Sequence, residues 1–199
     1  MARPELHSAD KILDSARELV LEGGARAATI DGIVSASGAP KGSIYHRFAT
    51  LNELLASMWL RAVRRSQDAF LAALAHPDAE EAAVAAGLAV HDFARGQPGD
   101  ARLLASLRRE DLLGSVSPDT QQALREVNDR LAVAVVALAR RLCGRASKSA
   151  VERTMCAVID LPQGAIRRHL IAGSPPPRSV RPQLEAAIRA ALETPLSSS

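Results

Sequence analysis

Apolar residues near the start of the chain repeat with the period of an α-helix. One face of this segment carries Ile12, Leu13, Ala16, Leu19 and Val20. Ser8 stands just before the segment, where its hydroxyl is suited to cap the first turn. Gly23 and Gly24 follow it, and glycine is the usual residue just past a helix end. The pattern therefore predicts a helix between Ser8 and the two glycines.

Two shorter amphipathic segments come next. The first follows Thr29, a predicted cap, and ends at Gly38; its apolar side consists of Ile30, Ile33 and Val34. The second has Pro40 in its first turn, and its Ile44 and Phe48 lie four residues apart on one face. Two short helices joined by a glycine-containing turn predict a helix-turn-helix.

The rest of the second segment is polar and consists of Lys41, Ser43, Tyr45, His46 and Arg47. Such side chains can contact the phosphates or the base edges of DNA. A solvated helix face would carry the same residue types. DNA binding is therefore one of two readings that the pattern alone leaves open.

Beyond residue 50 the apolar pattern extends over longer stretches. Helical periodicity predicts elements at residues 51–74, 79–95, 103–114, 118–142, 148–172 and 180–193. Residues 97–100 are expected to form a turn, and Pro162 is expected to kink or divide the helix that contains it. Because no strand-like alternation stands out, the expected fold class is all-α.

Composition and charge bear on the fold class, on DNA binding and on location in the cell. Aromatic residues make up 3% of the chain and alanine is frequent, which favours helices. The formal net charge is +3, but six basic and six acidic side chains balance within residues 1–50. A DNA-facing positive surface must therefore come from where the charges lie. No apolar run approaches the length of a membrane span, so we expect a cytoplasmic protein.

Catalysis is not expected. Acidic and basic groups are adjacent at His91-Asp92 and acidic groups at Glu110-Asp111, but neighbours on a helix point in different directions. No nucleophile motif, phosphate loop or metal-ligand spacing accompanies them, so neither a cofactor nor a metal is expected. Cys143 and Cys156 are expected to stay reduced, and a redox-sensing pair is the other reading.

Three stretches of the N-terminal region resemble the TetR family of repressors. They are Gly24-Ala25-Arg26-Ala27-Ala28-Thr29, Ile33-Val34-Ser35-Ala36-Ser37-Gly38-Ala39 and Gly42-Ser43-Ile44-Tyr45-His46-Arg47-Phe48. The last is the most specific, because its spacing, its glycine and both aromatic residues match the family pattern Gly-x-Leu-Tyr-x-x-Phe together. The resemblance covers roughly residues 1–60, and the remainder agrees only in the number and length of its helices.

The resemblance implies an N-terminal three-helix DNA-binding domain with a helix-turn-helix, residues 1–50. A larger C-terminal helical ligand-binding and dimerisation domain, residues 51–195, follows it, with about nine helices. The last two predicted helices, 148–172 and 180–193, would pair with their copies in a second subunit. A two-fold homodimer would then read a palindromic double-stranded DNA operator, with one recognition helix on each half-site.

The same resemblance assigns DNA contacts to particular residues. Thr29 would contact a backbone phosphate, and Lys41 would reach a guanine from the start of the recognition helix. The expected DNA-contacting set is Thr29, Pro40, Lys41, Gly42, Ser43, Tyr45, His46 and Arg47. Two other readings stay open: Tyr45 simply packs its ring, and Gly42 is tolerated only for steric reasons.

Three positions depart from the family pattern. Arg47 replaces the usual His, and Ala39 stands where Val is common. Leu51, followed by Asn52, takes the place where the family tends to have a phosphate-binding Lys. One backbone anchor is therefore missing, and we expect either a lower affinity for DNA or compensation by Arg47.

The function expected is a repressor that a small-molecule effector releases from its operator. The effector would bind among residues 51–143 or nearby, with candidate contacts Met58, Trp59, Phe70, His91, Phe93, Leu107, Met155, Cys156 and His169. Each of these also suits a core or a surface position. The alternative is a helical ligand-binding protein of the same fold with weak or lost DNA binding, which the neutral N-terminal region and Leu51 favour. An activator or a co-repressor-dependent regulator fits the same sequence.

Overall fold

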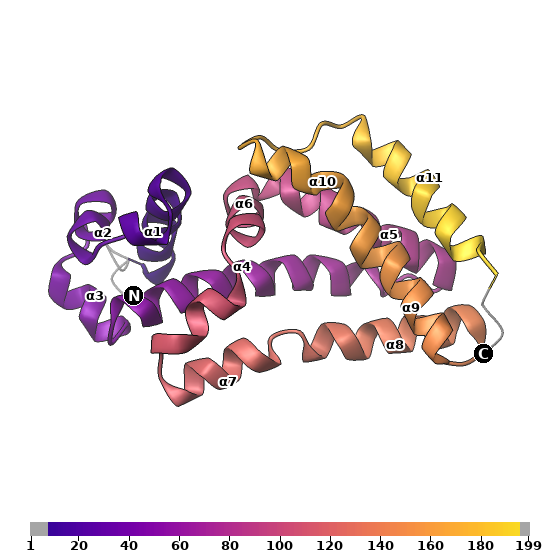
Figure 1. Cartoon of the computed structure of the whole chain (residues 1–199), viewed down its shortest axis with the longest axis horizontal. Coiled ribbons are helices and arrows are strands. Elements are labelled where there is room, and N and C mark those ends of the chain that lie inside the picture. The colour runs from indigo at the N-terminus through magenta and orange to yellow at the C-terminus, as the bar shows by residue number, and fades with distance from the viewer. Residues whose placement is uncertain (1–7, 196–199) are drawn as a thin grey trace, which may run out of the picture. The chain divides into compact units, whose positions relative to one another are not determined.

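The computed structural model describes residues 8–195, apart from the side chains of residues 114 and 115, and this part is helical (Figure 1). No strand occurs within residues 8–195, which confirms the all-α class. The chain divides into two compact units. Unit 1 comprises residues 1–63 and 102–126, and unit 2 comprises residues 64–101 and 127–199.

Unit 1 begins with the elements of the predicted helix-turn-helix. It contains α1 (Ala9–Gly23), a short 3-10 turn η1 (Ala25–Ala27), α2 (Ile30–Ser37) and α3 (Lys41–Arg47). The first part of α4 (Leu51–Ala73) and the end of α6 (Pro98–Ser106) follow, with η2 (Arg109–Ser115) and α7 (Pro118–Glu126).

The predicted caps form as expected. The Ser8 hydroxyl accepts the Lys11 backbone N–H at 3.2 Å, and the Thr29 hydroxyl accepts that of Gly32 at 3.1 Å. These bonds satisfy amide groups that the first turn of a helix leaves without partners. Gly38 ends α2 with φ 71°, in the left-handed region that glycine adopts without strain.

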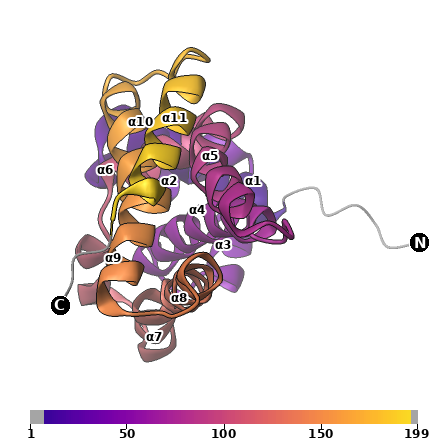
Figure 2. The ribbon, with the colours of Figure 1, turned by 90° about the vertical axis from the view of Figure 1, so that its right-hand side faces the viewer.

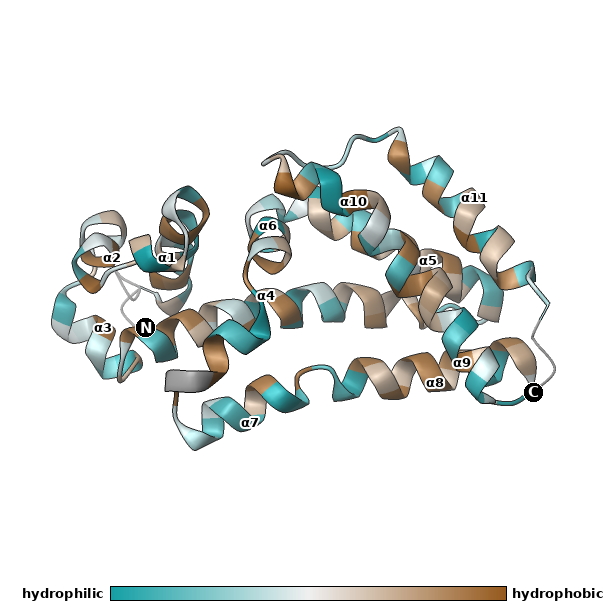
Figure 3. Ribbon diagram, viewed as in Figure 1, coloured by the Kyte–Doolittle hydropathy of each residue, from teal (hydrophilic) through white to brown (hydrophobic). Residues whose placement is uncertain are grey.

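Unit 2 contains the rest of α4, α5 (Ala79–Gly96), the start of α6 and the C-terminal helices. These are α8 (Asp129–Cys143), α9 (Lys148–Met155), the π-helical segment η3 (Cys156–Asp160), α10 (Leu161–Ile171) and α11 (Val180–Glu193). α5 packs against α10 and α11, and the three helices lie together in Figures 1 and 2. Figure 3 shows both apolar and polar residues along α11, and its buried Leu184, Ile188 and Leu192 recur every four residues, as in an amphipathic helix.

The core of unit 2 is tightest where α5 crosses α11. Ile188 is fully buried, and a Cβ atom built on Gly87 would lie 2.5 Å from its Cδ1 atom. Pro162 of α10 lies 3.4 Å from the same point. Glycine at position 87 thus lets α11 approach α5 closely.

Three sequence predictions about helix bounds are wrong. The helix expected at residues 103–114 is instead the end of α6 and the 3-10 segment η2, separated by the non-helical residues 107 and 108. The single helix expected at residues 118–142 is divided into α7 and α8, because the Gln67 side chain donates to the Val127 carbonyl at 2.8 Å and to Asn128 Oδ1 at 3.0 Å. The turn expected at residues 97–100 is instead the start of α6. Pro98 occupies its first position, where a missing N–H costs nothing.

A kink or a division of the helix is expected at Pro162, and there α9 continues through a π-helical segment into α10. Pro162 lies in the first turn of α10, and the π-helical segment η3 precedes it. The Leu161 N–H bonds to the Cys156 carbonyl, five residues back, which is the spacing of a π-helical turn. The helical course therefore continues past a residue that has no N–H of its own.

Within residues 8–195 no helix is both long and apolar enough to cross a membrane. The same residues hold no group of three or more His, Cys, Asp or Glu side chains arranged to bind a metal ion.

The α5–α11 crossing yields a stability prediction. Gly87→Ala should give a free energy of unfolding about 1 kcal/mol lower than Gly96→Ala does, because its methyl group overpacks against Ile188 and offsets the helix preference of alanine. Adding Ile188→Val removes the clashing Cδ1 atom and should restore part of the loss. Urea unfolding followed by circular dichroism measures both effects.

Gly96→Ala is the matched control, since a Cβ atom on this last residue of α5 meets nothing within 4 Å. It should be neutral or slightly stabilising. Equal stability of the Gly87→Ala and Gly96→Ala proteins would contradict a close crossing at residue 87.

Candidate nucleic-acid interface

The recognition helix α3 has one buried side. It is seven residues long, Ile44 is fully buried within it, and Phe48, which follows it, is 9% exposed. The turn before it is also fixed, because Ala39 is fully buried and its N–H donates to the Ser37 hydroxyl at 3.1 Å. The rest of α3 is therefore held in a defined orientation toward solvent.

Most of the expected DNA-contacting residues are exposed on unit 1. Thr29 lies at the start of α2, and Pro40, Lys41, Gly42, Tyr45 and His46 lie in or next to α3, all solvent-exposed. Ser43 and Arg47 are half-buried. Tyr45 is 47% exposed, so its ring is not buried in the core.

Gly42 has no steric role within the chain. A Cβ atom built at this position meets nothing within 4 Å among the described atoms. Of the two readings of this glycine, packing within the chain is therefore excluded. A side chain at this position would extend into open space outside the chain.

Lys41 is linked to the preceding helix. Its Nζ atom lies 2.9 Å from the Asp31 carboxylate, and both side chains are exposed. The hydrogen bond from Lys41 to Asp31, and then the carboxylate charge, raise the pKa of the lysine above its ordinary value. The ion pair joins the first turn of α3 to the first turn of α2. Sequence reasoning counted Asp31 only in the charge balance and missed this contact.

Arg47 bonds within its own helix. Its Nη1 atom donates to the Ser43 hydroxyl at 2.7 Å, and both residues are half-buried. The guanidinium is thus engaged on α3. Lys41 and Tyr45 of the same helix are more exposed, and Lys41 pairs with Asp31 of α2.

α4 connects α1 to the later elements of unit 1. The Arg61 guanidinium donates to Asp10 at 2.6 Å and to Asp14 at 2.5 Å, both on α1. The Trp59 indole N–H donates to the Leu107 carbonyl at 3.0 Å. This part of α4 is therefore tied both to α1 and to the α6–η2 connection.

Glu53 adds a third tie from α4. Its carboxylate accepts the Ser117 backbone N–H and, at 2.6 Å, the Thr120 hydroxyl at the start of α7. Burial alone would raise the pKa of Glu53, but these hydrogen bonds outweigh it and lower the pKa. The ionised carboxylate is therefore the form that holds α7 to α4.

The nine candidate effector contacts are spread over both units. Met58, Trp59 and Leu107 belong to unit 1, and the other six belong to unit 2. Met58 and Phe70 are buried, whereas Cys156 is exposed and lines a cavity of about 350 Å³ between α9 and α11. Leu107 lines a separate cavity of about 350 Å³ in unit 1.

His91 and Asp92 do not point apart, contrary to the sequence argument. The His91 Nδ1 atom lies 3.0 Å from Asp92 Oδ1, and Nε2 lies 3.3 Å from the Pro177 carbonyl. Asp92 also pairs with Arg181, and His91 is 1% exposed. His91 thus joins α5 to the α10–α11 connection, and Asp92 joins α5 to the first turn of α11. These contacts give the buried imidazole the polar partners that it needs.

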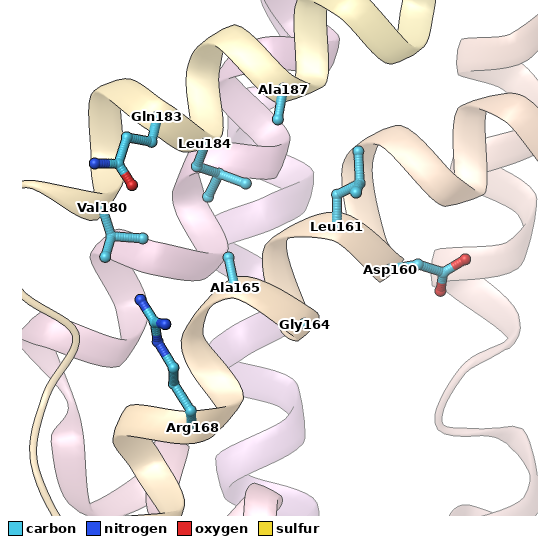
Figure 4. A pocket seen from close by; sticks show the side chains of 9 residues that line it. All are labelled: Asp160, Leu161, Gly164, Ala165, Arg168, Val180, Gln183, Leu184 and Ala187. Carbon is cyan, nitrogen blue, oxygen red and sulfur yellow. The ribbon is translucent and has the colours of Figure 1, made fainter.

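A groove of about 430 Å³ runs between α10 and α11 (Figure 4). Its lining includes the small residues Gly164, Ala165 and Ala187, larger apolar residues such as Leu161 and Leu184, and the opposite charges of Asp160 and Arg168. A Cβ atom on Gly164 would meet nothing within 4 Å. The groove is thus an open face of the two C-terminal helices.

The N-terminal region is similar to a known protein family. Residues 12–58 match the family model of the bacterial regulatory proteins of the tetR family. The match spans most of α1, all of α2 and α3, and the start of α4. No significant match to a curated protein is found.

Solved structures extend the similarity in fold over nearly the whole chain. The TetR family regulator PfmR from Thermus thermophilus is 19% identical with a TM-score of 0.69, over 91% of this chain and 96% of that one. The fatty acid degradation regulator FadR from Bacillus halodurans is 14% identical with a TM-score of 0.72, over 94% and 98%. FadR from Bacillus subtilis, solved in complex with stearoyl-CoA, is 12% identical with a TM-score of 0.70, over 94% and 98%.

The family model matches the segment in which the three sequence stretches and the exposed face of α3 occur, and the solved regulators share the fold. Residues 12–58 thus match the tetR family of bacterial regulatory proteins, and the chain has the fold of solved TetR-family regulators.

Proposed function

We propose that the chain is a repressor that binds a palindromic operator as a homodimer and leaves it when a small-molecule effector binds. The observation that carries the DNA-binding part is the exposed polar face of α3, with Lys41 at its start and Tyr45 further along. Residues at the N-terminal end of a recognition helix are those aimed at base edges in the major groove. Gly42, with open space around it, would let the backbone approach DNA closely.

The homodimer is proposed to form through α10 and α11. The groove between them is lined partly by small residues, which allow helices of a second copy to approach closely. A two-fold arrangement would place two recognition helices on successive major grooves, and the operator would then be palindromic. Residues 51–195 are the proposed effector-binding and dimerisation domain, and residues 1–50 the DNA-binding domain.

Effector release is proposed to act through α4. This helix is tied to α1 by Arg61, to the α6–η2 connection by Trp59 and to α7 by Glu53. Bacillus subtilis FadR, which has the same fold, was solved with stearoyl-CoA, so the fold accommodates a small molecule in that protein. An effector that favours one position of α4 would shift the population of DNA-competent molecules.

The first test concerns Lys41. Lys41→Ala should weaken binding to a DNA site selected from a random duplex pool by about tenfold or more and relax preference at one base pair of each half-site. Asp31→Asn is the partner variant, because it removes the carboxylate that holds Lys41 and should strengthen binding severalfold. Fluorescence anisotropy with labelled duplexes measures both affinities. Equal loss of affinity in the two variants would contradict a base-contacting role for Lys41.

The second test separates stability from DNA binding at Gly42. Gly42→Ala should raise the melting temperature slightly, because alanine favours a helix and its methyl group meets open space. The same change should weaken operator binding, because the methyl group would stand between α3 and the DNA. Thermal unfolding and anisotropy are measured on one preparation. Unchanged DNA affinity in this variant would refute a close approach of DNA to Gly42.

The third test addresses the dimer. Gly164→Glu places a charge in the α10–α11 groove without a clash inside the chain, and it should convert the protein to monomers. Gln163→Glu adds the same charge at the neighbouring exposed position outside the groove lining and should leave the dimer intact. Sedimentation equilibrium gives the mass of each protein. Dimers of undiminished stability in the Gly164→Glu protein would exclude this groove as the interface.

A further inference from the structure

The missing lysine at position 51 raises the question of which residue anchors the DNA backbone beside α2. Leu51 and Asn52 begin α4, and neither side chain carries a charge. Arg47, the substitute that the sequence suggested, donates to the Ser43 hydroxyl on its own helix. Another element of unit 1 must therefore supply any such anchor.

One cavity of unit 1 brings the relevant segments together. Its lining includes Arg26 of η1, Thr29 at the start of α2, and Leu51 and Asn52 at the start of α4. Arg26 thus lies beside the position where the family pattern places its lysine, although 25 residues of sequence separate Arg26 from Leu51. Arg26 belongs to the first sequence stretch that resembles the TetR family, but the resemblance assigns it no contact.

The start of α2, which lines this cavity, is also linked to the recognition helix α3. Asp31 lies two residues after Thr29 in the first turn of α2, and its carboxylate holds Lys41 at 2.9 Å. The start of α2 therefore faces the start of α3 on one side, and the cavity with Arg26 adjoins Thr29. A DNA strand contacted by Lys41 and Thr29 would pass close to Arg26.

The charge of Arg26 is uncompensated within the described residues. The other described arginines of residues 8–50 are engaged: Arg17 pairs with Asp14 at 3.0 Å, and Arg47 bonds to Ser43. Arg26 is exposed and makes no hydrogen bond or ion pair within residues 8–195. Asp111 shares the cavity lining, but its carboxylate accepts the Arg108 backbone N–H at 3.2 Å.

We infer that Arg26 is the phosphate-backbone anchor that replaces the lysine absent at position 51, an inference that rests on the proposed DNA binding. A guanidinium presents several N–H donors in a planar fork that matches a phosphate group. Because no ion pair holds Arg26, none has to break when a phosphate binds. Its contact positions the protein on the duplex and carries no base preference.

The test compares the charge at position 26 with the same charge elsewhere. Arg26→Gln should weaken binding to the selected site and to unrelated duplexes by the same factor, severalfold at low salt. The slope of the logarithm of affinity against the logarithm of salt concentration should fall by about one, since one phosphate contact is lost. Arg145→Gln, at an exposed position between α8 and α9, is the control and should keep the wild-type slope.

A rescue variant tests whether the positive charge is needed at the cavity that Arg26 and the start of α4 line together. Arg26→Gln combined with Asn52→Lys returns a cation to the start of α4 and should recover most of the salt slope. Wild-type slope and affinity in Arg26→Gln, beside weakened binding in Lys41→Ala, would overturn the role of Arg26 and leave the proposed function standing. A wild-type protein that binds no duplex would overturn both.

Discussion

The recognition surface depends on the burial of one side of a very short helix. A helix of seven residues is not stable alone in water, because nucleation costs more than so few hydrogen bonds return. α3 exists because Ile44 is fully buried, Phe48 nearly so, and Ala39 closes the turn before it. The orientation of Lys41, Gly42 and Tyr45 toward solvent follows from this burial.

The polar contacts around α3 then determine which charges are available to DNA. Asp31 holds Lys41, and Ser43 engages Arg47, whereas Arg26 is exposed without an ion pair. A nearly neutral N-terminal region is therefore compatible with DNA binding, because the placement and pairing of charges matter more than their sum. Arg61, Trp59 and Glu53 link α4 to α1, to the α6–η2 connection and to α7 within unit 1, and the proposed effector release would act through these contacts.

Local patterns predicted the helices well where the cause of a boundary was itself local. Ser8 and Thr29 cap their own helices, and Pro162 follows the π-helical segment between α9 and α10. The break between α7 and α8 could not be foreseen, because Gln67, which holds it open, is 60 residues from Val127. The exposed face of α3 was predicted from its residues. The Lys41–Asp31 pair and the approach of Arg26 to Leu51 depend on how helices pack, and apolar candidates such as Met58 cannot be told from core residues by type.

The selection of binding sites from a random pool of double-stranded DNA by the purified chain tests the central claim most directly. The account predicts enrichment of one palindromic sequence whose half-sites are separated by about one helical turn, or a multiple of it, in keeping with two recognition helices of a dimer. Recovery of DNA without any enriched sequence, over repeated rounds and at low salt, would contradict it.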